Sequence, residues 1–276
     1  MSAPPAAGDP PTVTEHHLGH HRVHVLNLKG APGVSVTLPL AFSSPVRTDL
    51  IRRAVVSAQS RRIQPHGTSP TAGMRHSVEW SGKGKGVART PRLMGSMRGA
   101  QSPNTVSGRA AHPPRVATLW AKKVNVKERR LAFAAALAAT REAKLARARG
   151  HDIPEELHLP VVFETPVEEI TTAAEARELL RRVKIWADVT RAADGTHENA
   201  GRGKRRGRRL HEPRSLLLVI SAAGKARGFR NLPGVDVVPV MRLGTEDLAP
   251  GGDPGRLTLF SQAALDSLTT RLEAAA

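Results

Sequence analysis

The chain has 276 residues, no cysteine, and 42 Lys and Arg against 24 Asp and Glu, which gives a net charge of +18 at neutral pH. A chain of this length can bury a sizeable core. Without cysteine there is no disulfide, thiolate zinc site or cysteine nucleophile. The sequence pI of about 11.5 predicts a polyanionic partner, because a strongly positive field attracts phosphate groups.

The positive charge is concentrated in two segments. From Arg61 to Arg130 there are 15 basic residues against 2 acidic ones, and from Ala200 to Arg214 there are 7 against 1, whereas the rest is nearly neutral. The stretch from Trp80 to Lys127 contains no acid at all. Arginine outnumbers lysine 32 to 10, which favours structured phosphate contacts through a planar guanidinium fork.

The first predicted segment, residues 1 to 21, is rich in Pro and His and is expected to be a flexible extension. His16, His17, His20 and His21 have the spacing of a helical metal site, but Gly19 interrupts them and the flanking residues are expected to be disordered, so no metal site is predicted. The extension has no apolar signal core, and no apolar run in the chain approaches the ~20 residues of a membrane span. A cytoplasmic protein without membrane contact is expected.

Order is expected to begin with two short strands, Val23 to Leu26 and Val34 to Leu38, joined by a turn. Apolar positions at helical spacing then predict a helix from Thr48 to about Arg61. Residues 62 to 124 show no such pattern and are rich in Gly, Pro, Ser and Arg. A segment of this kind is expected to be an extended loop that becomes ordered against RNA.

Periodic patterns resume at Asn125, where capping-box spacing to Glu128 predicts one alanine-rich helix that runs to Arg149 and stops at Gly150. Strands are predicted at 159–163, 186–189, 216–220, 235–240 and 257–260, and helices at 173–183 and 261–272. Thr165 with Glu168, and Thr172 with Glu175, have capping spacing. Residues 200 to 209 are expected to form a second basic loop.

The alternation of strands and helices predicts an α/β fold, a three-layer body with a mostly parallel sheet plus a long extended internal loop. The predicted division is a flexible extension at 1–21, a globular α/β domain made of 22–61 and 125–276, and an extended RNA-binding loop at 62–124 inserted in it.

Several motifs have a second interpretation. Gly82, Gly84 and Gly86 alternate with lysines, but they lack the GxxxxGK[ST] order of a phosphate-binding loop and the flanking strand and helix, so a close-approach loop is favoured. The cluster from Arg202 to Arg209 is read as an RNA-binding loop rather than a localisation signal or a solvated charge run.

Trp80 and Trp120 flank the acid-free stretch, and stacking on a base and packing against the returning segment both remain open. The carboxylates are interpreted as solvated helix faces and caps; they are Glu155, Glu156, Glu168, Glu169, Glu175 and Glu178. No catalytic constellation and no cofactor site is predicted.

Longer motifs carry a resemblance to a known family. They are Leu38-Pro39, Phe42, Pro45-Val46-Arg47, Asp49-Leu50, Trp80, Gly86–Arg89, Pro91-Arg92, Ala111–Pro114, Lys123–Asn125, Arg149–His151, Arg230–Asp236, Thr245–Gly252 and Gly255-Arg256. In this order they resemble the archaeal and eukaryotic branch of large-subunit ribosomal protein four, over about Val23 to Leu268.

The resemblance implies a structural constituent of the large ribosomal subunit, cytoplasmic and ribosome-bound, which catalyses no reaction. Its partners would be large-subunit rRNA, neighbouring large-subunit proteins and the nascent peptide in the exit tunnel. Its loop tip, about Gly82 to Arg92, would line that tunnel, with Gly82, Lys83, Gly84, Lys85, Gly86 and Arg89 at the tip. Arg98, Arg109, Lys122 and Lys123 would lie along the stalk.

The full set of predicted rRNA-binding residues combines the resemblance with the charge pattern. It is Arg61, Arg62, Trp80, Lys83, Lys85, Arg89, Arg92, Arg98, Arg109, Arg115, Lys122, Lys123, Arg129, Arg130, Arg202, Lys204, Arg205, Arg206, Arg208 and Arg209. Compared with the family, the segment Ser81–Lys85 is more cationic, and Arg109-Ala110-Ala111 stands where many members have further Arg. Two alternatives are an α/β enzyme acting on a nucleotide or RNA, and a free RNA or nucleoid chaperone.

Overall fold

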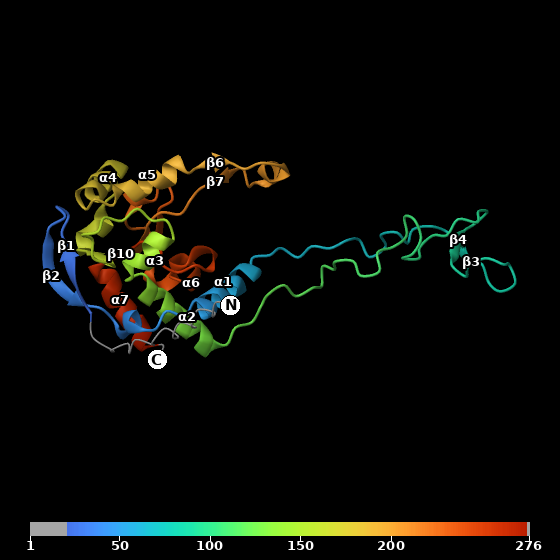
Figure 1. The fold of residues 1–276 in the computed structure, drawn as a ribbon, viewed down its shortest axis with the longest axis horizontal. Coiled ribbons are helices and arrows are strands. Elements are labelled where there is room, and N and C mark those ends of the chain that lie inside the picture. Colours follow the sequence, from blue (N-terminus) through green and yellow to red (C-terminus); the bar gives the residue numbers. More distant parts are fainter. Residues whose placement is uncertain (1–20, 275–276) are drawn as a thin grey trace, which may run out of the picture. The chain divides into compact units, whose positions relative to one another are not determined.

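The computed structural model describes residues 21 to 274. Six strands form one sheet in the order β2-β1-β5-β10-β8-β9, in which β1 and β2 are antiparallel and all other neighbours are parallel (Figure 1). The strands are β1 (Arg22–Leu26), β2 (Pro32–Thr37), β5 (Val161–Phe163), β8 (Leu217–Ile220), β9 (Asp236–Pro239) and β10 (Thr258–Ser261). The predicted α/β fold with a mostly parallel sheet is confirmed.

Both faces of the central strands are buried. At strand β8, Leu216, Leu218 and Ile220 belong to one apolar cluster, whereas Leu217 and Val219 belong to another. Successive side chains of a strand point to opposite faces, so the two clusters lie on opposite sides of the sheet. All five residues have no measurable exposure, which explains why this strand reads as a continuous apolar run.

The helices contribute to these two clusters. Residues of α3 (Ala143–Ala148), α4 (Ala173–Arg182) and α5 (Trp186–Asp194) belong to the first cluster. Residues of α1 (Thr48–Ser60), α2 (Val126–Ala139), α6 (Thr245–Leu248) and α7 (Gln262–Glu273) belong to the second (Figure 1). No helix among residues 21 to 274 is long and apolar enough to cross a membrane.

Two predicted helix starts are confirmed by their capping bonds. The Oγ1 atom of Thr172 accepts a hydrogen bond from the Glu175 backbone N at 3.4 Å, and the Oγ atom of Ser261 accepts one from the Ala264 backbone N at 3.1 Å. Each bond satisfies a backbone donor that the first helical turn leaves unpaired. The helix predicted from Thr48 is also present and ends at Ser60.

The single helix predicted from Asn125 to Arg149 was wrong. Helix α2 ends at Ala139, and α3 begins at Ala143 after a break in which Glu142 is extended. The Oγ1 atom of Thr140 donates to the Leu137 carbonyl at 2.7 Å, so a side chain competes locally with the helical ladder. The expected capping box is absent too, because the side chain of Asn125 makes no capping bond.

The strand predicted at 186–189 was also wrong, because these residues open α5. Val189 and Ala192, three positions apart, are both buried, so the apolar pattern has the period of a helix rather than of a strand. A four-residue window is too short to distinguish the two periods.

The predicted solvent exposure of Glu168 was wrong as well. Its side chain is buried, and both carboxylate oxygens accept hydrogen bonds: Oε1 from Ser221 N at 2.7 Å and from Ser261 Oγ, and Oε2 from Ser221 Oγ and Lys225 Nζ, each at 2.7 Å. Burial raises the pKa of this carboxyl, but the bonds from Lys225, Ser221 and Ser261 outweigh that effect, and the pKa is lowered. The residue links the carboxyl ends of β8 and β10 rather than capping a helix.

Residues 59 to 122 form a second compact unit, separate from the unit that holds the sheet. It contains the short strands β3 (Val78–Trp80) and β4 (Pro91–Leu93). The predicted cluster of His16, His17 and His20 lies outside the described residues. Within residues 21 to 274, no group of three or more His, Asp or Glu is placed to hold a metal ion.

Candidate nucleic-acid interface

The predicted loop tip is closed at its base by a small hairpin. Strands β3 and β4 pair antiparallel, with Glu79 opposite Arg92 and Trp80 opposite Pro91. The Oγ atom of Ser81 donates to the Ala88 carbonyl at 3.1 Å, which brings the two ends of the intervening turn together. The tip therefore has a defined base although it buries no core.

Arg92 differs from the other cations of this segment because its guanidinium is used within the hairpin. Nη2 donates to the Ala88 carbonyl at 3.1 Å, and Nη1 donates to the Met97 carbonyl. The sequence placed Arg92 among the RNA-binding residues, whereas its bonds assign it to bracing the turn. Its contact with RNA stays a prediction.

The tip itself is shaped by glycines in the left-handed region. Gly82, Gly84 and Gly86 have φ values of +64°, +81° and +65°, and a Cβ atom on any of them would meet nothing within 4 Å. Backbone conformation, not lack of space, therefore requires glycine here. Between them, Lys83 and Lys85 are exposed, as is Arg89 further along the turn.

The two halves of the 59–122 unit touch at several points. The Thr68 backbone N donates to the Pro114 carbonyl at 3.1 Å, and a Cβ on Gly67 would lie 2.7 Å from the Val116 backbone N. The Gln101 side-chain amide donates to the carbonyls of Met74 and His76 at 2.9 and 2.7 Å. The outgoing and returning halves of the segment are therefore held together by hydrogen bonds to backbone carbonyls.

The two flanking tryptophans have different environments. Trp120 stacks on the His66 ring, with centroids 4.9 Å apart and planes inclined by 16°. Packing against the other half of the segment, one of the two open alternatives, is therefore what Trp120 does. Trp80 is 67% exposed and has its indole face available for a base.

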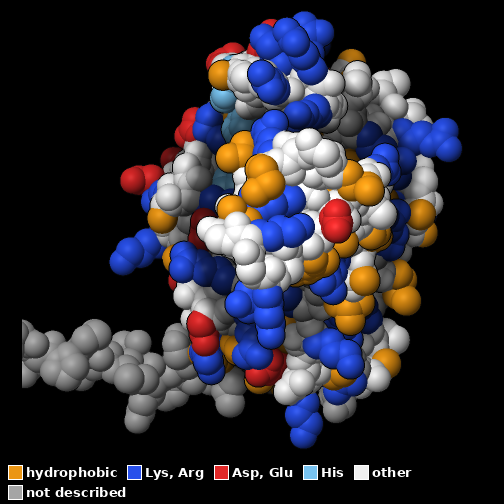
Figure 2. Space-filling view, turned by 90° about the vertical axis from the view of Figure 1, so that its right-hand side faces the viewer, with side chains coloured by type: hydrophobic (Ala, Val, Ile, Leu, Met, Phe, Trp, Pro, Cys, Tyr) orange, Lys and Arg blue, Asp and Glu red, His pale blue; other side chains and the backbone are white. Residues whose placement is uncertain are grey.

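Several basic side chains of this unit form no ion pair within the described chain. Glu79 is the only carboxylate between residues 59 and 122, and none of the ion pairs found in the described part of the chain involves it. The cations without an ion pair there include Lys83, Lys85, Arg89, Arg98, Arg109 and Arg115, all exposed. Figure 2 shows a face on which Lys and Arg side chains far outnumber acidic ones.

The start and end of the insertion also carry predicted cations. Arg61 and Arg62 follow the last residue of α1, Ser60, whose Oγ accepts a hydrogen bond from the Lys122 backbone N at 3.0 Å. In the other unit, Lys123 precedes α2, and Arg129 and Arg130 are exposed in the first turns of that helix.

The second basic loop joins a two-stranded ribbon of β6 (His197–Glu198) and β7 (Leu210–His211), which the sequence did not reveal. The carboxylate oxygen Oε1 of Glu198 lies 3.4 Å from Arg209 Nε and 4.0 Å from Lys204 Nζ. The other four cations of the loop have no ion pair within the described chain and are exposed; they are Arg202, Arg205, Arg206 and Arg208. One carboxylate therefore leaves most of the charge of this loop uncompensated.

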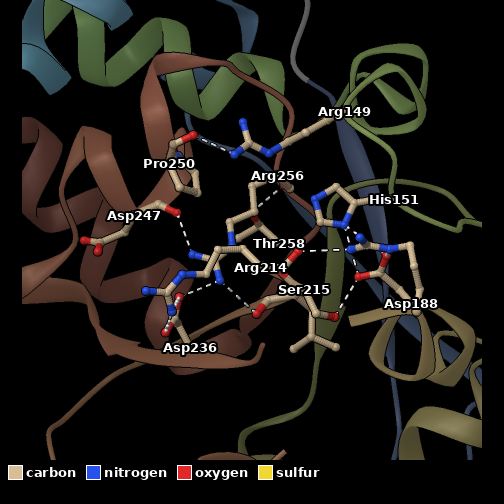
Figure 3. A network of polar contacts seen from close by, with 12 residues as sticks. Arg149, His151, Asp188, Arg214, Ser215, Asp236, Asp247, Pro250, Arg256 and Thr258 are labelled. Carbon is tan, nitrogen blue, oxygen red and sulfur yellow. Dashed lines mark hydrogen bonds and ion pairs between the residues drawn. The ribbon is translucent and has the colours of Figure 1, made fainter. Parts of the chain in front are cut away.

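Sequence reasoning missed a buried polar network in the α/β unit (Figure 3). The carboxylate of Asp188 accepts hydrogen bonds from Ser215 Oγ at 2.6 Å, from Arg191 Nε at 2.9 Å and from His151 Nδ1 at 3.1 Å. Burial raises the pKa of Asp188, but the bonds from His151 and Arg191 prevail and lower it. The only sequence signal was the motif Arg149-Gly150-His151, because the partners are far apart in the chain.

Fold and site together define an α/β protein with a large basic insertion and, within residues 21 to 274, no group of His, Asp and Glu placed to hold a metal ion. The chain belongs to the ribosomal protein L4/L1 family, whose model matches residues 36–271. This membership confirms the resemblance drawn from the motifs, and it confirms the prediction of a structural ribosomal protein rather than an enzyme.

Individual relatives agree over almost the whole chain. It is 48% identical over 254 residues to large ribosomal subunit protein uL4 of Methanopyrus kandleri, covering 90% of this chain and 98% of that protein. For uL4 of Aeropyrum pernix the identity is 46% over 254 residues, covering 91% and 93%. For uL4 of Haloquadratum walsbyi it is 41% over 245 residues, covering 89% and 98%. These relatives are archaeal, which agrees with the archaeal type that the sequence motifs predicted.

Proposed function

We propose that the chain is a structural constituent of the large ribosomal subunit that binds large-subunit rRNA, supports its assembly and lines the nascent-peptide exit tunnel with its loop tip. The proposal rests on family membership and on one structural observation. The exposed cations Lys83, Lys85, Arg89, Arg98, Arg109 and Arg115 form no ion pair within the described chain, so their charge is available to an external polyanion.

The binding mechanism is phosphate neutralisation. Each Lys or Arg that contacts a phosphate releases condensed counterions, so the logarithm of the affinity falls by about 0.9 units per contact for each unit of log salt on a duplex. Guanidinium groups favour fixed, bidentate phosphate contacts, which suits a chain in which arginine predominates. The few aromatic residues make base stacking a minor contribution, with exposed Trp80 the best-placed candidate.

The insertion is suited to passing through narrow gaps in folded RNA. Gly82, Gly84 and Gly86 present bare backbone where a neighbouring surface would approach, and Lys83, Lys85 and Arg89 present charge beside it. This segment is the proposed tunnel-lining tip. A three-layer body with an insertion at 62–124, a cytoplasmic and ribosome-bound location, and neighbouring proteins and the nascent peptide as further partners belong to the same proposal.

Sedimentation of a cell extract in moderate salt tests this function. One copy of the protein per large subunit is the expected result, and tagged protein should co-sediment with large-subunit rRNA. A protein found mainly free of ribosomes would overturn the proposal and favour a free RNA chaperone. A second measurement uses Trp80: adding purified large-subunit rRNA should quench its fluorescence in a variant in which Trp120 and Trp186 are both replaced by Phe.

A further inference from the structure

One pocket of the α/β unit gathers cations that were not among the predicted rRNA-binding residues. It lies against the first residue of α1, Thr48, the end of α3 at Arg149, and the segment His211 to Arg214. Its volume of about 680 Å³ is far more than the ~30 Å³ that one water molecule occupies. The pocket can therefore admit a group of substantial size.

Arg149 is the best-fixed cation of this pocket. Its Nη2 donates to the Pro250 carbonyl at 2.6 Å (Figure 3). Its Nη1 donates to the Asp253 carbonyl. Both acceptors are neutral, and this guanidinium has no ion pair within the described chain. Two nitrogen atoms of the guanidinium, Nη1 and Nη2, therefore donate to backbone carbonyls, and the remaining N–H groups can donate to a ligand.

Two further arginines line the pocket with donors to spare. Arg191 uses Nε for Asp188 and Nη2 for the Arg214 carbonyl, so its Nη1 makes no hydrogen bond to the described chain. Arg214 uses Nη1 for Asp236, and its side chain is 56% exposed. Both guanidinium groups are thus positioned by existing bonds and still carry free N–H groups.

The same pocket also contains a buried histidine, His151. His151 is only 5% exposed, yet it lines the pocket, and its Nδ1 points at Asp188. Its Nε2 has no hydrogen-bond partner among residues 21 to 274. In the view of Figure 3 the ring lies between Asp188 and Arg149.

Of the three arginines in this pocket, only Arg149 has no ion pair within the described chain. The other two arginines are paired, Arg191 with Asp188 and Arg214 with Asp236. The lining also contains the carboxylates Glu212 and Asp253 and the histidines His151 and His211. Asp253 is paired with Arg52 at 3.0 Å. Burial and the neighbouring charge of Arg256 lower the pKa of Arg149, and the nearby Asp253 carboxylate offsets them only in part; a bound anion would favour the charged guanidinium further.

We propose that the pocket formed by Arg149, His151, Arg191 and Arg214 binds a backbone phosphate of RNA. This proposal rests on the proposed function and adds to it a phosphate site in the α/β unit, outside both basic loops. Guanidinium groups held by prior bonds lose little freedom when they grip a phosphate. The start of the 13-residue helix α1 at Thr48 adds favourable dipole charge to the same pocket.

The test compares two full-length variants that each lose one positive charge from the α/β unit. Arg149→Gln removes the proposed phosphate ligand, and Arg182→Gln removes an exposed arginine of α4 that pairs with Glu178 away from the pocket. Binding to purified large-subunit rRNA is measured across a range of salt concentrations. Arg149→Gln should weaken binding roughly tenfold and reduce the log–log salt slope by about one, whereas Arg182→Gln should change neither appreciably.

Equal behaviour of the two variants would overturn the pocket proposal while leaving the proposed function intact. Failure of the unaltered protein to bind rRNA would overturn the proposed function itself. Because Arg149 also holds two carbonyls, thermal melts of both variants accompany the binding curves. If Arg149→Gln does not fold, Arg149→Lys takes its place, and it should retain the salt slope but lose affinity because the fork is gone.

A measurement on the unaltered protein identifies the source of the phosphate. The imidazole NMR signals of His151 are followed during titration with inorganic phosphate and, separately, with a short RNA duplex. A shift caused by RNA and only weakly by inorganic phosphate supports a backbone phosphate site. Saturation by inorganic phosphate that RNA does not displace would show that the pocket takes a free anion, and an unchanged signal in both titrations would also overturn the proposal.

Discussion

The guanidinium of Arg256, only 2% exposed, donates through Nη2 to the carboxylate oxygen Oδ2 of Asp236 at 2.6 Å. Arg256 also donates to the carbonyls of Ser215, Asp247 and Leu216 at 3.0, 3.0 and 3.3 Å. One buried cation therefore joins the start of β8, the start of β9 and helix α6. Asp236 supplies the only charge that pairs with it in the described chain.

Replacing Asp236 with Asn should therefore destabilise the α/β unit. Removing one partner of a fully buried ion pair costs about 3–5 kcal/mol, and the 31% exposure of the Asp236 side chain reduces the expected loss to roughly 2 kcal/mol. Urea unfolding measures this difference. The control is Glu178→Gln, which removes an exposed helix pair with Arg182 and should cost only about 0.5 kcal/mol. Similar losses in the two variants would contradict the assigned role of Asp236.

Stability should fall at acidic pH in a way that depends on Asp188. Its folded-state pKa is lowered by the bonds from His151, Arg191 and Ser215, despite burial. A carboxyl with a depressed folded pKa contributes stability above its unfolded pKa of about 3.9, and that contribution is lost as the pH falls towards the folded pKa. Unfolding free energies at pH 6 and pH 3 should differ less in Asp188→Asn than in the unaltered protein. An identical difference in both proteins would rule out this carboxyl as a source of acid sensitivity.

Two glycines of the α/β unit separate backbone strain from steric clash. Gly224 and Gly234 both have left-handed φ values, +93° and +67°, but only at Gly234 would a Cβ meet backbone, 2.5 Å from the Pro213 carbonyl and 2.9 Å from Ser215 N. Gly224→Ala should cost about 1 kcal/mol, the strain of a left-handed alanine. Gly234→Ala should cost at least about 2 kcal/mol more, because the chain around Pro213 must move. Thermal melts of the two variants test this order.

A shortened chain tests whether the insertion is needed for folding. Deleting residues 68 to 115 joins Gly67 directly to Val116, which are already in backbone contact. The α/β unit should keep its cooperative melt, because no residue of its two apolar clusters is removed. The log–log salt slope of rRNA binding should fall by several units, since seven Lys or Arg besides Arg92 leave with the segment. Loss of the melt would mean that the insertion belongs to the folding unit.

What the sequence predicted well was local. Apolar runs such as Leu216 to Ile220 and the capping pairs at Thr172 and Ser261 carry their signal within a few residues. The strand at Leu217–Ile220 and the starts of helices α4 and α7 could therefore be predicted from them. The insertion was visible because its lack of periodicity and of acids extends over dozens of residues. These features depend on composition and spacing, which a single sequence contains.

What the sequence could not show depends on distant partners. Glu168 has ordinary helix-cap spacing, and its burial follows from Ser221, Lys225 and Ser261, which lie 53 to 93 residues later. Arg149 reaches carbonyls more than 100 residues away, so the pocket beside it has no local signature. In Trp186 to Val189, four residues fit a strand and a helix equally well, and only the packing of α5 decides.

The place of β10 in the sheet has a consequence for synthesis. This strand, Thr258–Ser261, lies between β5 and β8 and pairs in parallel with both, yet it is the last of the six strands of this sheet to be made. Until it has left the ribosome, the facing edges of β5 and β8 have no partner, and the side chain of Ser261 cannot reach Glu168. The basic insertion is translated more than a hundred residues earlier. A newly made chain therefore exposes its cations before its sheet can close, and the unpaired edges of β5 and β8 stay open to wrong pairing until β10 has emerged.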